Sequence, residues 1–274
     1  MTVTPTTGGQ VRAEVTDWDL LWTFGRSVLR AMVTVRRPRP SGVSTVDHHR
    51  LEPILATVAA GGIEHLAATG DPLNDYLDHL SQVDPEQLSR DEALAFWVNL
   101  YNAGALTVAA EARALEAGTV LRVPGAFQRP ITVIAGETLS LDGIEHGKIR
   151  RFGDPRIHAG LVCGSVSCPT LRAEPYTGEQ IGSQLEDQMR RFLATGGLGI
   201  NRSDRRVSLS RIFRWYGADF VRPRRMPTLL PAAPRSILRA LARWVDPGDA
   251  AWIETTTPDI GFQRYDWGLH CAVT

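Results

Sequence analysis

The segment "DPEQLSRDEALAFWVNLYNAGALTVAAEARAL" (84–115) carries the clearest helix signal in the sequence. Asp84 precedes Pro85, which suits the first position of a helix, and Ser89 and Glu92 form a second capping box a few residues later. Through the middle of the segment nearly every side chain is apolar. Because a helix that is apolar on most sides is buried, the segment predicts a long central helix on which the other elements pack.

The elements on either side of this helix indicate the fold class. Helices are predicted before it, at about 46–68 and 72–82. After it, "ITVIAGETLSL" alternates about a central glycine and predicts a hairpin, and "IHAGLVC" (157–163) predicts a buried strand. The remainder predicts a strand at 205–209 and helices at 211–220 and 235–245. With too few βαβ units for a doubly wound sheet, the pattern favours an α+β fold, a helical N-terminal half packed on a small, mostly antiparallel sheet.

The N-terminal part differs in composition from the rest. Residues 1–16 are polar and predict a disordered start, and apolar residues recur at helical spacing over 18–35. "RRPRPSG" then predicts a basic linker, so that residues 1–44 precede a single domain over 45–274. The helix at 18–35 either packs on that domain or serves a protein partner or a membrane surface.

Composition excludes several classes of protein. The chain has 274 residues, of which 43% are hydrophobic and 22% charged, and its charges balance at a pI of about 7.1. No overall field therefore favours a nucleic-acid partner. The sequence shows no signal-peptide pattern and no long uncharged apolar run, so we expect no transmembrane segment. Three cysteines are too few for a disulfide-stapled scaffold, which predicts a cytoplasmic protein with free thiols.

Two amides interrupt the apolar middle of the central helix. Asn99 and Asn102 lie three residues apart and therefore share one face. A buried amide must find hydrogen-bond partners. These side chains either tie the helix to a neighbouring loop, or one of them orients a catalytic imidazole or donates to an oxyanion.

A second polar cluster lies in "GIEHGKIR" (143–150), which predicts a short helix. His146 and Arg150 share one face of this helix, and Glu145 points about a quarter-turn away. A surface helix explains these charges equally well. However, the glycines that flank Glu145 and His146 weaken the helix without an evident gain for folding, which favours a functional role.

The third cluster is "HAGLVCGSVSCP" (158–169), which holds two of the three cysteines. A thiol at Cys163 would end the predicted strand near free backbone N–H groups, which lower a thiol pKa or bind an oxyanion. In such a strand His158 would lie on the opposite face, on the order of 16 Å from Cys163. His146, on a separate helix, is therefore the better candidate base, and His158 is a packed histidine or a group behind the site.

Several segments together resemble the bacterial branch of the domain of unknown function 547 family, over roughly residues 50–270. The matching segments are "AFWVNLYNA" (95–103), "LSLDGIEHGKIR" (139–150), "DPRIHAGLVCGSVSCPTLR" (154–172), "YTGEQI" (176–181), "VSLSRIFRWYGADF" (207–220) and "YDWGLH" (265–270). His270 stands where the family is expected to have an asparagine. The resemblance implies a cysteine-dependent site and an architecture similar to papain-like or transglutaminase-like proteins.

The favoured functional interpretation is a cysteine-dependent enzyme that transfers acyl groups or hydrolyses amides through a thioester. Cys163 would be the nucleophile and His146 the base, oriented by Asn99, Asn102 or Glu145. A small-molecule or peptide-like substrate would be contacted by Arg150, Ser165, Cys168 and His158. This chemistry needs no cofactor and no metal.

Three alternatives stay open at this point. The protein is a binding or scaffold module whose buried polar cluster only fixes the fold. Alternatively, Cys163, Cys168, His146 and His158 bind zinc, for which the ligand types are suitable. In the last alternative, Cys163 and Cys168 form a redox pair.

Overall fold

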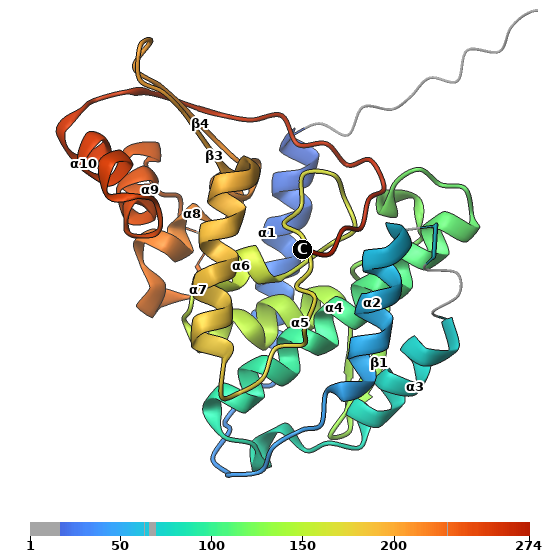
Figure 1. Ribbon diagram of the computed structural model, residues 1–274. Helices are drawn as coiled ribbons and strands as arrows, with labels where there is room; N and C mark the ends of the chain where they lie inside the picture. Colours follow the sequence, from blue (N-terminus) through green and yellow to red (C-terminus); the bar gives the residue numbers. More distant parts are fainter. Residues whose placement is uncertain (1–16, 63, 66–69, 229) are drawn as a thin grey trace, which may run out of the picture.

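The computed structural model describes residues 17–62, 64–65, 70–228 and 230–274 (Figure 1). The disordered start predicted for residues 1–16 lies outside the described residues. The helices are α1 (Asp17–Thr34), α2 (Glu52–Gly61), α3 (Gly70–Ser81), α4 (Arg90–Ala114), α5 (Leu141–Gly147), α6 (Ile157–Gly160), α7 (Ile181–Phe192), α8 (Arg211–Val221), α9 (Pro234–Leu241) and α10 (Pro247–Thr255). The strands are β1 (Thr132–Ile134), β2 (Glu137–Leu139), β3 (Leu198–Asn201), β4 (Arg206–Leu209) and β5 (Asp259–Phe262).

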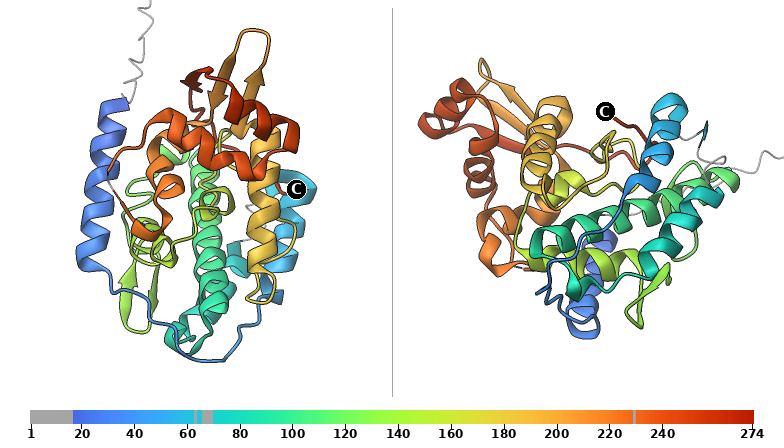
Figure 2. Two further views of the ribbon diagram at one scale, coloured as in Figure 1. Left: turned by 90° about the vertical axis from the view of Figure 1, so that its left-hand side faces the viewer. Right: turned by 60° about the horizontal axis from the view of Figure 1, so that its bottom comes forward.

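Helix α4 is the predicted central helix, and α1 and α7 run along opposite sides of it (Figure 2). Ser89 caps it, because its Oγ accepts the backbone N–H of Glu92 at 3.2 Å. Asp84 and Pro85 start a separate short turn instead. By length and composition α4 could cross a membrane, but 89% of its most apolar window is buried inside the protein. This burial agrees with the expectation of no transmembrane segment.

The predicted α+β fold class is confirmed, but its strands form two separate small sheets in the described part of the chain. Strands β1 and β2 pair antiparallel through a turn in which Ala135 and Gly136 have positive φ, as a tight hairpin requires. In the other sheet β4 pairs antiparallel with β3 and parallel with β5. The two sheets stay apart because the hairpin packs with the N-terminal helices, whereas β4 contributes to the core of the C-terminal half.

The core consists of two hydrophobic clusters of buried residues. The first gathers around α2, α3, α4 and α5, and the second around β4, α8 and α9. Helix α7 contributes to both, with Leu185 in the first cluster and Met189 in the second. Helix α6 does the same through Ile157 and Ala159. The two clusters are therefore joined through α6 and α7.

The strand predicted over 157–163 was wrong, because residues 157–160 form the short helix α6. Asp154 starts this turn by accepting the backbone N–H of Arg156 at 3.0 Å. A short, fully buried apolar run has the same pattern in a helix and in a strand. Leu161, which follows this helix, has an extended backbone. The distance estimated for His158 and Cys163 on a strand therefore does not apply.

Helix α1 packs against α5. Ser27 Oγ donates to Asp142 Oδ2 at 2.6 Å, and the end of α1 continues into Val35, which lies against Gly147. A Cβ at Gly147 would come within 2.4 Å of Val35 Cγ1, so only glycine allows this approach. The glycine at this position therefore does serve folding, contrary to the sequence-based interpretation.

Gly147→Ala is expected to destabilise the protein by about 1–3 kcal/mol, because the added methyl group must displace Val35. Urea denaturation followed by circular dichroism measures the change. Gly143→Ala is the matched control in the same helix: its Cβ would meet no atom closer than 3.4 Å. The control is expected to be neutral or to stabilise by up to about 1 kcal/mol. Equal effects of the two changes would contradict the role given to Val35.

The segment after α1 is held against the domain. Arg36 donates its backbone N–H to Glu137 at 2.7 Å, and Arg39 does the same to Glu86 at 2.7 Å. On the other side of α1, Leu29 and Val33 are 56% and 78% exposed. A protein partner or a membrane surface for helix 18–35 stays a prediction, as does the division into residues 1–44 and a single domain over 45–274.

Candidate functional site

A cavity of about 310 Å³ lies where the two hydrophobic clusters meet. It brings together five residues that the sequence predicted for the site, namely Glu145, His146, His158, Cys163 and Cys168. The other walls include Tyr101 of α4, Ile212, Trp215 and Tyr216 of α8, and Tyr265 and Trp267 of the C-terminal segment. The three predicted clusters of polar residues therefore converge on one cavity.

Cys163 begins a turn that surrounds its sulfur with hydrogen-bond donors. The Cys163 Sγ lies 3.1 Å from Cys168 Sγ, 3.2 Å from Ser165 Oγ and 3.4 Å from the hydroxyl of Tyr265. Gly164 has a φ of 80°, a left-handed conformation that glycine adopts without strain. The C-terminal segment returns beside this turn, where Ser165 forms a β-bridge with Leu269 (Figure 1). This return places Tyr265 at the sulfur.

These contacts shift the pKa values of the two cysteines in opposite directions. The hydrogen bond from Cys168, with those from Ser165 and Tyr265, lowers the pKa of Cys163 to about 6, although burial raises it. Burial raises the pKa of Cys168 well above that of a free thiol, and its hydrogen bond with Cys163 raises it further. At neutral pH Cys163 is therefore a thiolate and Cys168 a thiol that donates to it.

Glu145 is poised to exchange a proton near neutral pH. Burial raises its pKa to about 7, although hydrogen bonds from Tyr216 and Tyr101 and the charge of Arg150 oppose that rise. A carboxyl group with such a pKa is present in both protonation states at pH 7. Groups of this kind are suited to general acid–base catalysis.

His146 is neutral in this site. Burial lowers its pKa well below the usual value, and the charges of Arg150 and His158 lower it further. Its Nδ1 lies 3.4 Å from Arg150 Nη1 and 3.6 Å from Glu145 Oε1. The pKa of Cys163 is thus lowered by neutral hydrogen-bond donors and not by His146, the base that the sequence suggested.

A buried charge network adjoins the cavity, and His158 is its member that lines the cavity. Arg150 donates from Nε and Nη2 to the two oxygens of Asp219, at 2.8 and 3.0 Å, and both side chains are fully buried. His158 Nε2 lies 2.9 Å from Asp219 Oδ2, and its ring stacks on Tyr216 at 4.0 Å between centroids. Arg150, predicted to bind substrate, therefore supports the cavity wall from behind. Through Tyr216 the network also reaches Glu145.

Asn99 and Asn102 hold the backbone around the site. Asn99 pairs with the backbone of Tyr176, donating to its carbonyl at 2.7 Å and accepting its N–H at 3.0 Å. Asn102 donates to the Gly160 carbonyl at 2.9 Å and accepts the N–H of Val162 at 3.0 Å. These bonds correspond to the first interpretation of the two amides: Asn102 ties the central helix to the segment that leads into Cys163, and Asn99 ties it to the backbone at Tyr176.

Aromatic rings of α8 and of the C-terminal segment form another part of the cavity wall. Trp215 stacks with Trp267 at 5.8 Å between centroids, and Tyr265 packs on both rings at 4.9 and 4.5 Å. Flat apolar surfaces of this kind bind the apolar part of a ligand. In the described part of the chain, no three His, Cys, Asp or Glu side chains are placed to hold one metal ion.

Sequence reasoning did not assign Asp219, Tyr216, Tyr265 or the aromatic wall to the site. All of them lie in segments quoted for the family resemblance, 207–220 and 265–270. That resemblance was the signal that could have found them, because nothing local in either segment points to a thiol as far as 102 residues earlier in the chain.

Comparison with known proteins supports the resemblance over part of its range. Residues 85–193 match the family model described as "Protein of unknown function, DUF547". No curated protein and no solved structure matches the chain. Membership of the bacterial branch and a papain-like or transglutaminase-like architecture stay predictions. Residues 85–193, which include Glu145, His146 and both cysteines of the cavity, are thus the part of this chain that is similar to the DUF547 family.

Proposed function

We propose that this protein is a cysteine-dependent enzyme that transfers or hydrolyses the acyl group of a small or peptide-like substrate. The observation that carries the proposal is a thiol of lowered pKa, Cys163, in the wall of a cavity that also holds Glu145. A thiolate is the nucleophilic form of cysteine, and a carboxyl group of pKa about 7 can give and take a proton. The predicted cytoplasmic location remains part of the proposal, because Cys163 must be reduced to react.

The reaction has two stages. The Cys163 thiolate attacks the carbonyl carbon of the substrate and forms a C–S bond, the C–N or C–O bond breaks, and protonated Glu145 gives its proton to the leaving group. Water or an acceptor amine then attacks the thioester, and Glu145 takes up its proton. The C–S bond breaks and returns the thiolate.

Glu145 replaces His146 as the proposed proton carrier. His146 is neutral, and its pKa lies too low for it to hold a proton in the first stage. We assign to it a positioning role, because its Nδ1 faces Glu145 Oε1 at 3.6 Å. Cys168, Ser165 and Tyr265 stabilise the thiolate before attack and after its release.

One distance favours a second candidate function. The sulfurs of Cys163 and Cys168 are 3.1 Å apart, so the pair could pass two electrons and two protons to a disulfide substrate and close its own disulfide. In that function Cys168 is a reactant, whereas in acyl transfer it is a hydrogen-bond donor. Changing Cys168 therefore separates the two functions.

Cys168→Ser is expected to keep acyl transfer from p-nitrophenyl acetate within about tenfold of the wild-type rate, because serine still donates a hydrogen bond to Cys163. Cys163→Ala is expected to form no acyl enzyme. Release of p-nitrophenolate gives the rate, and peptide mass spectrometry locates the acetyl group.

Hydroxyethyl disulfide serves as the redox probe in the same variants. The dithiol function would be favoured if the wild type turns over this probe, both cysteine variants do not, and p-nitrophenyl acetate leaves no acetyl group on Cys163. No turnover of either probe would favour the binding or scaffold module.

A further inference from the structure

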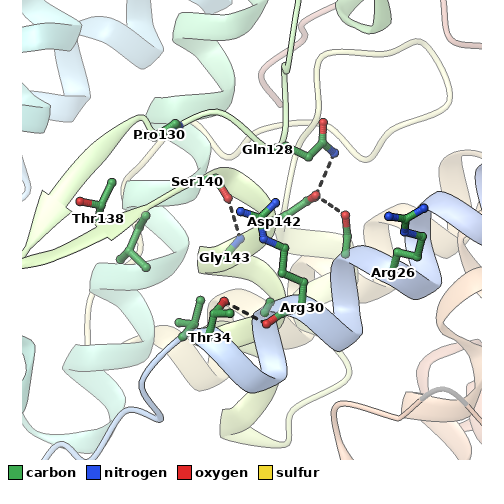
Figure 3. A pocket seen from close by; sticks show the side chains of 13 residues that line it. Arg26, Arg30, Thr34, Gln128, Pro130, Thr138, Ser140, Asp142 and Gly143 are labelled. Atoms are coloured by element: carbon green, nitrogen blue, oxygen red, sulfur yellow. Dashed lines mark hydrogen bonds between the residues drawn. The ribbon is translucent and has the colours of Figure 1, made fainter.

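A second cavity, of about 580 Å³, lies against α1 (Figure 3) and shares lining residues with the thiol cavity. We propose that it binds an anionic group, a carboxylate or a phosphate, at the far end of the substrate whose acyl carbon reacts with Cys163. The inference rests on the proposed function, to which it adds a class of substrate. Its walls come from α1, from the end of β2 and the start of α5, and from the segment that precedes β1.

The charges of this cavity favour an anion. Arg26 and Arg30 lie one turn apart on α1 and both line it, and Figure 3 shows Arg30 extending toward Asp142. The charged side chains among the described lining residues are these two guanidiniums and one carboxylate, that of Asp142. Guanidinium groups recognise carboxylates and phosphates through paired hydrogen bonds. The hydroxyl groups of Thr138 and Ser140 add neutral polar groups to the same walls.

Asp142 is already engaged by partners of its own. Ser27 Oγ and Gln128 Nε2 both donate to Asp142 Oδ2, at 2.6 and 2.8 Å. Burial raises the pKa of Asp142, and the charge of Arg30 is one of the contributions that oppose this rise. The carboxylate therefore balances at most one of the two guanidiniums, and the cavity keeps a net positive charge.

The same three residues belong to the walls of both cavities. Ser27, Gln128 and Asp142 line the arginine cavity and also the cavity of Cys163 and Glu145. A substrate that extends past these three side chains would place its acyl carbon at the thiolate and its other end at the arginines. An acyl compound with an acidic group at its far end has this form, whereas a wholly apolar ester does not.

The experiment compares two series of thiol reagents with Cys163 as the target. One is a series of ω-(bromoacetamido)alkanoates of increasing chain length, and the other is the corresponding uncharged amides. The bromoacetamido group is the same in both, so the amide rate reports the reactivity of Cys163 and the ratio of the two rates reports the arginine cavity.

The acid is expected to react faster than its amide at one or two chain lengths. Arg26→Gln and Arg30→Gln are each expected to lower that ratio by about threefold to fivefold. Arg239→Gln is the matched control, since it removes the same charge from an exposed position on α9 and is expected to leave the ratio unchanged. A ratio that is equal in all variants at every chain length would overturn the inference.

A direct measurement covers the case in which Cys163 itself does not react. Titration with glutarate, and separately with inorganic phosphate, is followed through the side-chain NMR signals of Arg26 and Arg30. Saturable shifts with glutarate alone identify a carboxylate, and shifts with phosphate alone a phosphate. An unreactive Cys163 would then refute the proposed function alone, whereas no shift with either anion would refute the anion site.

Discussion

Glu145→Gln is expected to slow hydrolysis of the Cys163 thioester by roughly 10²- to 10⁴-fold at about pH 8, the usual contribution of a general base. Glutamine keeps the size of the side chain and one oxygen that accepts from Tyr216 and Tyr101, but it cannot take a proton from water. The acetyl enzyme formed from p-nitrophenyl acetate should therefore accumulate in this variant. Its decay is measured by mass spectrometry of the intact protein.

The pH dependence of this decay is a separate consequence of the same assignment. Burial raises the pKa of Glu145 to about 7, so the base form is lost as the pH falls through 7. Hydrolysis by the wild type should rise through that midpoint with increasing pH, and the rise should be absent in Glu145→Gln. Glu254→Gln, at an exposed position, is the control for the loss of one charge. A wild-type midpoint that persists in Glu145→Gln would assign the proton transfer to another group.

Asp219→Asn is expected to destabilise the protein by about 3–5 kcal/mol, because it leaves the fully buried Arg150 without its opposing charge. The free energy of unfolding from urea titration at pH 7 measures the loss. Asp259→Asn is the matched control, since its pair with Arg206 is exposed and should contribute about 0–1 kcal/mol. A loss below about 1 kcal/mol for Asp219→Asn would mean that water or another group compensates Arg150.

The stabilisation by Asp219 should also depend on pH. Although burial raises its pKa, the hydrogen bond from His158 and the charge of Arg150 lower it to about 2, below the ordinary value of 3.8. A carboxyl group with a lowered pKa stabilises the folded state above its unfolded pKa, and the stabilisation is lost as the pH falls. The difference between wild type and Asp219→Asn should therefore be constant above about pH 5 and shrink between pH 4 and pH 2.

Helices and strands whose signals come from residues close together in the chain could be predicted from the sequence. The start of α4 follows from Ser89 and Glu92, three residues apart, and its burial follows from its apolar composition. The hairpin follows from alternation on both sides of Ala135 and Gly136. Short apolar runs carry no such information. The segment 157–163 was assigned to a strand because burial on all sides removes the period that distinguishes a strand from a helix.

For the candidate site, too, some features could be predicted from the sequence and others depend on the tertiary structure. The sequence alone determined that Cys163 and Cys168 share one turn and that Glu145 and His146 share one short helix, because each pair is close in the chain. Only the tertiary structure decided that the pKa of Cys163 is lowered, that the pKa of Glu145 is raised and that His146 is neutral. A pKa depends on burial and on partners, and these come from distant segments: Tyr265 reaches Cys163 from 102 residues away, and Tyr216 reaches Glu145 from another helix.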